Sequence, residues 1–131
     1  MKTDSLADRV FPDLPTDVRK MVKYDWPSIY STSSRRAADL ISNILSNYVD
    51  EDATITDATS GIGGNTISLS KKFKRVHSVE LDQTRFMYLC HNMNLYGCNN
   101  VIYYNANYLN ICWNLDQDAV LIDPPWGGAS I

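Results

Sequence analysis

A glycine-rich turn between a predicted strand and a predicted helix restricts the fold of this chain more than any other feature. The turn covers residues 58–65 and carries glycines at positions 61, 63 and 64. It follows a predicted strand, residues 53–57, and precedes a predicted helix that starts at Thr66. Glycine tolerates positive φ and lets a ligand approach the backbone closely. This order of elements therefore indicates an α/β fold that binds a nucleotide.

Three further strands are predicted at residues 76–80, 101–104 and 119–122, and helical patterns separate them. Alternating strands and helices predict a parallel sheet with right-handed crossovers, whose ligands bind at the carboxyl ends of the strands. Candidate site residues follow every predicted strand. They are Asp57 with the glycine-rich turn, Glu80, residues 105–107 and residues 123–128.

Two regions are expected within the 131 residues: an N-terminal arm, residues 1–33, and a Rossmann-like domain, residues 34–131. Prolines at positions 12, 15 and 27 interrupt the arm, so it is expected to be only partly helical. Thr16 is expected to cap a short helix over residues 16–24. The large apolar side chains of this segment favour an arm that packs on the domain, and an arm that contacts the substrate is the alternative.

The first helix of the domain is expected to start after the serines of residues 31–34, which can cap it. Arg35 and Arg36 lie in its first turn, where cations are unfavourable, so they are expected to be solvated or to lie near an anion. Six apolar residues at helical spacing are expected to share one face: Ala37, Leu40, Ile41, Ile44, Leu45 and Tyr48.

Two acids indicate the kind of cofactor. Asp57 opens the glycine-rich turn, where its charge would repel a pyrophosphate but suit an ammonium group. Glu80 lies 19 residues after Gly61, the spacing expected of an acid that binds ribose hydroxyls. S-adenosylmethionine carries an ammonium, a sulfonium and a ribose diol, and no phosphate. The residues therefore favour S-adenosylmethionine over NAD.

The segment Asp123-Pro124-Pro125-Trp126 suggests a site for a flat ring that bears an amino group. The carboxylate can accept a hydrogen bond from the amine, the prolines leave carbonyls free to face it, and the indole can stack on the ring.

Composition excludes several other classes of protein. A net charge of −3 argues against long-range capture of a nucleic-acid backbone. Three cysteines without a Cys-x-x-Cys pair predict neither a disulfide framework nor a zinc site, and no metal is expected. No run of 18 apolar residues and no apolar leader occur, so the sequence predicts an intracellular protein of the nucleus or cytoplasm.

The chain resembles class I, Rossmann-like S-adenosylmethionine-dependent methyltransferases, and among them the trimethylguanosine synthases, which are RNA cap guanine-N2 methyltransferases. The resemblance covers roughly residues 25–128. It is carried by Ile55-Thr56-Asp57-Ala58, Gly61-Ile62-Gly63-Gly64-Asn65-Thr66, Val79-Glu80-Leu81-Asp82, the segment from Asn92 to Gly97, and Pro124-Pro125-Trp126-Gly127-Gly128.

The resemblance implies roles for the matching residues. Asn107 stands where the family usually has an aspartate that binds the adenine amino group, and its amide oxygen can accept the same bond. Trp126 would stack on the cationic 7-methylguanine ring, and Ser31 matches a serine near the cap phosphates. The implied sets are Asp57, Thr59, Gly61, Gly63, Asn65, Glu80, Asn107 and Asp123 for the cofactor, Asp123, Pro124 and Trp126 for catalysis, and Ser31, Pro125 and Trp126 for the capped RNA.

Other activities stay open at this point. Asp123 stands where close relatives often have serine and where other amino-group methyltransferases have Asp or Asn. The alternatives are methylation of guanine-N2 in structural RNA, of adenine-N6 or of a protein amide, and a non-catalytic module that binds a cap or the cofactor. Because the chain ends soon after the fourth strand, the sheet is expected to be truncated there, with a partner or a missing C-terminal segment completing the fold.

Overall fold

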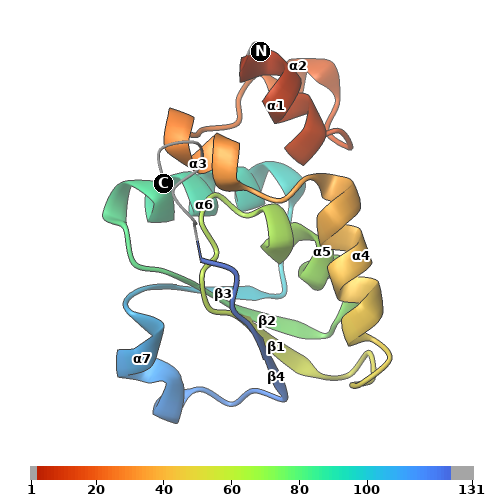
Figure 1. Ribbon diagram of the computed structural model, residues 1–131, viewed down its shortest axis with the longest axis vertical. Coiled ribbons are helices and arrows are strands. Elements are labelled where there is room, and N and C mark those ends of the chain that lie inside the picture. Colours follow the sequence, from red (N-terminus) through yellow and green to blue (C-terminus); the bar gives the residue numbers. More distant parts are fainter. Residues whose placement is uncertain (1–2, 125–131) are drawn as a thin grey trace.

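The computed structural model describes residues 3–124, and side chains from Leu6 onward. A four-stranded sheet lies at its centre, formed by β1 (Thr54–Asp57), β2 (Arg75–Glu80), β3 (Val101–Asn105) and β4 (Ala119–Leu121) (Figure 1). The strand order is β3-β2-β1-β4 and every pair is parallel. The predicted parallel α/β sheet is confirmed, and all four strands end on the same edge.

Three helices form the layer that packs on this sheet: α4 (Arg35–Leu45), α5 (Gly64–Lys72) and α6 (Gln83–Tyr96). The connection from β3 to β4 is shorter and consists of α7 (Tyr108–Ile111), the 3₁₀ turn η1 (Cys112–Asn114) and irregular chain. One buried cluster lies between the sheet and α5, and consists of Ala53, Ile55, Leu69, Phe73 and Val76. Burial of such side chains is the main favourable term in folding.

The arm is more helical than the prolines suggest, with α1 (Thr3–Val10), α2 (Thr16–Arg19) and α3 (Trp26–Ser31). The prediction that Thr16 caps a helix is wrong: it is the first helical residue of α2, Pro15 holds the cap position, and no side chain caps this helix. Figure 1 shows α1 to α3 above the carboxyl ends of the strands. Phe11 of the arm is fully buried in one cluster with Leu89 and Met93 of α6.

One buried amide joins the arm to the glycine-rich turn. The side chain of Asn92 on α6 donates from Nδ2 to the carbonyls of Lys23 (2.9 Å) and Ile62 (3.1 Å). Its Oδ1 accepts the backbone N–H of Lys23 at 2.8 Å. Because Asn92 is fully buried, each of these bonds replaces one with water that burial has removed. The arm is thereby held at a defined position beside the turn.

Helix α4 starts as predicted, but the face that it buries is rotated away from the predicted one and keeps Leu45 against the buried cluster. Ser34 is its N-cap and accepts the Ala37 N–H at 3.1 Å. The buried residues are Arg35, Ala38 and Ser42, whereas Leu40 and Tyr48 from the predicted apolar face are exposed. The predicted face was wrong because Arg35 occupies the interior: its guanidinium donates to Ser68 Oγ at 2.7 Å and to the Gly64 carbonyl.

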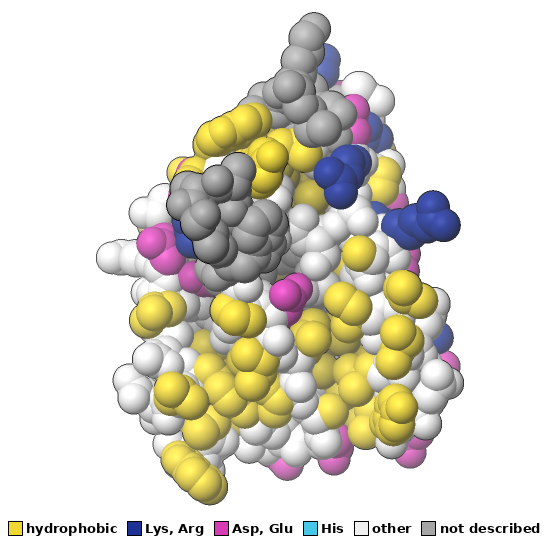
Figure 2. Space-filling model, viewed as in Figure 1, with side chains coloured by type: hydrophobic (Ala, Val, Ile, Leu, Met, Phe, Trp, Pro, Cys, Tyr) yellow, Lys and Arg dark blue, Asp and Glu magenta, His cyan; other side chains and the backbone are white. Residues whose placement is uncertain are grey.

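Exposed apolar side chains therefore gather on the face that Figure 2 shows, over α4 and around β4 and α7. The large side chains among them include Leu40 and Ile44 of α4, Tyr48 just after it, and Leu109, Trp113 and Ile122 near the end of the described chain.

The glycine-rich turn requires glycine at position 63 for two reasons. Gly63 has φ of +110°, a conformation that residues with a Cβ rarely adopt. A Cβ at this position would also lie 2.3 Å from Met93 Cε and 3.3 Å from Leu89 Cδ1. Both contacted side chains are fully buried, so they have little room to move away.

We expect Gly63→Ala to lower the free energy of unfolding by about 2–5 kcal/mol, the sum of backbone strain and overpacking. Gly97→Ala is the matched control, because Gly97 has φ of +68° but its Cβ would meet no atom within 4 Å. That variant should lose only about 1–2 kcal/mol, the backbone part. Urea unfolding measures both values. Equal losses would show that close packing at Gly63 does not matter.

Candidate functional site

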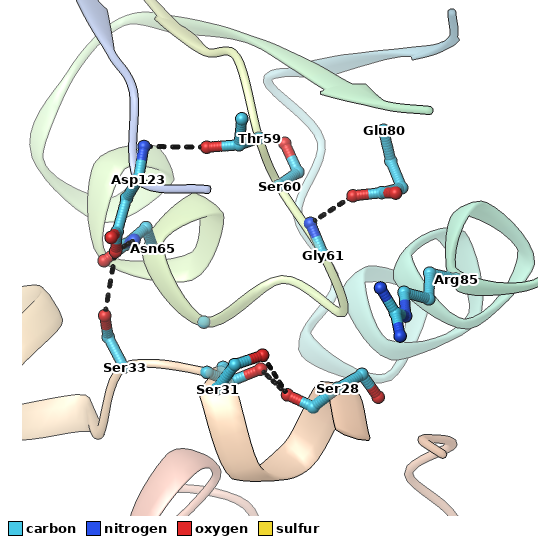
Figure 3. A pocket seen from close by; sticks show the side chains of 12 residues that line it. Ser28, Ser31, Ser33, Thr59, Ser60, Gly61, Asn65, Glu80, Arg85 and Asp123 are labelled. Carbon is cyan, nitrogen blue, oxygen red and sulfur yellow. Dashed lines mark hydrogen bonds between the residues drawn. The ribbon is translucent and has the colours of Figure 1, made fainter. Parts of the chain in front are cut away.

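Two pockets adjoin each other at the carboxyl ends of the strands. The polar pocket lies between α3, the glycine-rich turn and the start of α6 (Figure 3). It is lined mainly by hydroxyl, amide and charged groups: Ser28, Ser31, Thr32, Ser33, Thr59, Ser60, Gly61, Gly64, Asn65, Glu80, Arg85 and Asp123. The more apolar pocket, about 760 Å³, lies between the ends of β1 to β4 and includes Ala58, Leu81, Ala106, Asn107, Leu109, Ile122 and Pro124. This volume is within the range of sites for small-molecule cofactors.

Glu80 belongs to the walls of both pockets, together with Thr59 and Arg85. Its Oε1 accepts the Gly61 N–H and its Oε2 accepts the Asp82 N–H, each at 2.8 Å. Each carboxylate oxygen retains a further lone pair. Glu80 is therefore positioned at the junction of the pockets, and can accept hydrogen bonds from a diol placed there.

Asp57 lies below the polar pocket and is not part of its wall. Its side chain is fully buried, and Oδ2 accepts a hydrogen bond from Thr66 Oγ1 at 2.8 Å. Burial raises the pKa of the Asp57 carboxyl to about 6, against hydrogen bonds from Thr66 and the Thr59 N–H, and the charge of Asp123 adds to the rise. Oδ1 is buried and has no hydrogen-bond partner among residues 3–124. Asp57 thus orients the turn from beneath.

Asp123 leaves β4 directly beside the turn. Its backbone N–H donates to Thr59 Oγ1 at 2.8 Å, and its Oδ2 accepts from Asn65 Nδ2 at 3.2 Å and Ser33 Oγ at 3.3 Å. These partners come from the arm (Ser33), the glycine-rich turn (Thr59) and the start of α5 (Asn65). Asn65 itself is buried, and its Oδ1 has no hydrogen-bond partner in the described residues. The structure therefore brings Thr59, Asn65 and Asp123 together, as the sequence predicted of a shared site.

Asn107 and Pro124 lie in the apolar pocket. Asn107 is the N-cap of α7, and its Oδ1 accepts the Leu109 N–H at 3.0 Å. The second lone pair of this oxygen and the whole Nδ2 group remain available to a ligand.

Ser31 lies instead in the polar pocket, where its hydroxyl donates to the Pro27 carbonyl at 3.1 Å. It is thus beside residues predicted for the cofactor. Gly61, with φ of +57°, lines the same pocket.

Arg85, Ser28 and Ser33 line the polar pocket but were not predicted as site residues. No sequence motif marks the two serines, because α3 is brought to the turn only by folding. Arg85 lies in the first turn of α6, and its Nε is 3.6 Å from Asp25 Oδ2. Its position five residues after Glu80 was the signal available in the sequence.

Pro125 and Trp126, predicted for the RNA substrate, lie outside the described residues. Within residues 3–124 no cluster of three or more His, Cys, Asp or Glu side chains could hold a metal ion. Among the helices of the same region, none has the length and apolarity needed to cross a membrane.

Residues 52–131 match the family model described as RNA cap guanine-N2 methyltransferase. The chain is 32% identical over 149 residues to an uncharacterized protein of Acanthamoeba polyphaga mimivirus, covering 95% of this chain and 58% of that protein. It is 31% identical over 113 residues to trimethylguanosine synthase of Schizosaccharomyces pombe, covering 81% of this chain and 46% of that protein. The chain thus spans about half the length of these relatives.

Solved structures share the fold. An rRNA methylase from Streptococcus thermophilus superposes with a TM-score of 0.56 at 18% identity, over 63% of this chain and 51% of that chain. A candidate methyltransferase from Streptococcus mutans, in complex with SAH, superposes with a TM-score of 0.55 at 21% identity, over 62% and 46% of the two chains. The predicted Rossmann-like methyltransferase fold is confirmed.

We expect Asp57→Asn to change how stability depends on pH. Because the pKa of Asp57 is about 6 in the folded protein and 3.8 in the reference state, the folded state holds an extra proton between these values. The wild type should therefore lose stability relative to the variant as the pH rises from 4 to 7, by up to about 3 kcal/mol. Urea unfolding of both proteins across this range measures the difference. If the difference in stability between the two proteins does not change with pH, the raised pKa of Asp57 is contradicted.

Proposed function

Since the chain belongs to the RNA cap guanine-N2 methyltransferase family, we propose that it binds S-adenosylmethionine and takes part in methylation of N2 of a 7-methylguanosine cap. The observation that carries the proposal is the position of Asp123 beside the glycine-rich turn. Its backbone N–H lies 2.8 Å from Thr59 Oγ1, and its Oδ2 lies 3.2 Å from Asn65 Nδ2. This contact joins the segment that would bind the methyl acceptor, residues 123–126, to the two pockets.

The donor groups of the two pockets suit S-adenosylmethionine. The polar pocket offers Asp123 and the unpartnered Asn65 Oδ1 to an ammonium group. Glu80 lies where the pockets adjoin and would bind the ribose hydroxyls. Leu81 and Ile122 supply apolar surface for the adenine, with Asn107 available for its amino group. Asp123 follows β4, Glu80 ends β2 and Asn107 follows β3, so these three groups lie along the strand order β4-β1-β2-β3 as the ammonium, ribose and adenine lie along the cofactor.

When bound, S-adenosylmethionine supplies a methyl carbon whose bond to sulfur breaks as the bond to guanine N2 forms, and N2 releases a proton. Asp123 would orient the amine: Oδ2 is held by Ser33 and Asn65, while Oδ1 accepts no hydrogen bond from residues 3–124. The Pro124 carbonyl is the second proposed acceptor. Such positioning can contribute up to ~7–11 kcal/mol to catalysis. Asp123 would also stabilise the positive charge that develops on N2.

Transfer of labelled methyl from S-adenosylmethionine tests the proposal. We expect transfer to a 7-methylguanosine cap analogue and not to an unmethylated cap or an adenine oligomer. The assay uses the chain alone and within the longer natural protein if the reading frame continues. Transfer to the adenine oligomer only would replace the proposal with adenine-N6 methylation, for which the carboxylate of Asp123 is the favouring feature. Cofactor binding with no transfer in either form would indicate a non-catalytic module.

Trp126 is proposed to stack on the 7-methylguanine ring. We expect Trp126→Ala to weaken binding of a 7-methylguanosine cap analogue about 10-fold to 100-fold, the range of a lost base–aromatic stack. Trp113→Ala is the control, since Trp113 is 92% exposed on η1, and it should leave affinity unchanged. Calorimetric titration measures both. If Trp126→Ala binds the analogue as tightly as the wild type, the stacking role is wrong.

A further inference from the structure

Arg85 lies at the wall of both pockets, and its ion pair with Asp25 leaves most of its hydrogen-bond donors unused within residues 3–124. Figure 3 shows its guanidinium facing the polar pocket from the side opposite Asp123. Its side chain is 24% exposed, and its ion pair with Asp25 is long, with 3.6 Å between Nε and Oδ2. Nε is buried and makes no hydrogen bond within the described part of the chain. That nitrogen faces Asp25, whereas the two terminal nitrogens of the guanidinium lie on the pocket side (Figure 3) and can donate hydrogen bonds to a ligand there.

The polar pocket carries its negative and positive side chains on opposite sides. Among its described lining residues, Arg85 is the one cation, and the acids are Glu80 and Asp123. Both oxygens of Glu80 accept backbone N–H groups, from Gly61 and Asp82. Asp123 and Asn65 therefore provide acceptors on one side and Arg85 provides donors on the other (Figure 3). A zwitterionic amino-acid group matches this arrangement, with its ammonium toward Asp123 and its carboxylate toward Arg85.

A phosphate group fits the same pocket less well. Two carboxylates in its wall, from Glu80 and Asp123, would oppose the multiple charge of a cap triphosphate. A carboxylate carries a single charge and matches the planar fork of a guanidinium, which can donate two parallel hydrogen bonds to it. The pocket chemistry therefore favours the amino-acid end of the cofactor over the phosphates of the RNA.

We propose that Arg85 is a cofactor-binding residue that holds the carboxylate of the methionine part of S-adenosylmethionine. This inference rests on the proposed function. Asp25, the N-cap of α3, orients the guanidinium from the arm side. The contact of Arg85 with the methionine carboxylate would thereby connect the arm, through Asp25, to the position in which the cofactor binds.

Calorimetric titration with two ligands tests the role of Arg85. The ligands are S-adenosylmethionine and its decarboxylated analogue, which has the same sulfonium and adenosine but no carboxylate. We expect the wild type to prefer S-adenosylmethionine about 10-fold to 100-fold, as for charge-assisted hydrogen bonds. Arg85→Gln should remove most of this preference by weakening S-adenosylmethionine alone, and Arg85→Lys should retain part of it. Arg75→Gln is the matched control, since it removes an exposed arginine at the start of β2, outside both pockets, and should keep the preference.

The outcomes separate this inference from the proposed function. Equal weakening of both ligands by Arg85→Gln, or an unchanged preference, would overturn the role of Arg85 while the proposed function stands. Selective weakening of a 7-methylguanosine triphosphate, with cofactor affinity unchanged, would assign Arg85 to the RNA and also overturn the inference. If the wild type binds neither adenosyl ligand, the proposed function itself fails. Should Arg85→Gln not fold, the preference of Arg85→Lys decides between the same outcomes.

Discussion

The buried carboxylate of Asp57 is the constraint on which the site depends. It ends β1, beneath the glycine-rich turn, with no solvent exposure. Its raised pKa shows that burial disfavours its charge. The hydrogen bond from Thr66 offsets part of this cost, and it also orients the chain as it passes from strand to helix. The conformation of the turn therefore depends on a group that lies beneath the pocket and is not part of its wall.

The pocket walls come from segments far apart in the sequence. The arm contributes Ser33, the turn contributes Asn65, and the end of β4 contributes Asp123, which accepts hydrogen bonds from both. Asn92 holds the arm against the turn through buried hydrogen bonds. The arm is therefore part of the site's architecture. A change that loosens it would alter the polar pocket even if every residue of the turn were kept.

The sequence was a good guide where position along a strand determines exposure. Glu80 and Asp123 follow predicted strands, and parallel strands bring their carboxyl ends to one edge, so both were expected at the site. It was a poor guide to helix faces. For α4 the apolar pattern predicted burial of Leu40 and Tyr48, yet they are exposed, and Arg35 is buried because Ser68 and the Gly64 carbonyl accept its hydrogen bonds. Periodicity carries no information about such long-range partners.

The sequence by itself determined the α/β class, the order of strands and helices along the chain, the glycine-rich turn, and the family. Those properties depend on local conformation and on motifs of adjacent residues. Only the tertiary structure decided that Asp57 lies under the pocket, that α3 forms one of its walls, and that Arg85 faces Asp123 across it. The physical reason is that burial and charge pairing depend on packing between distant segments, which spacing along the chain does not specify.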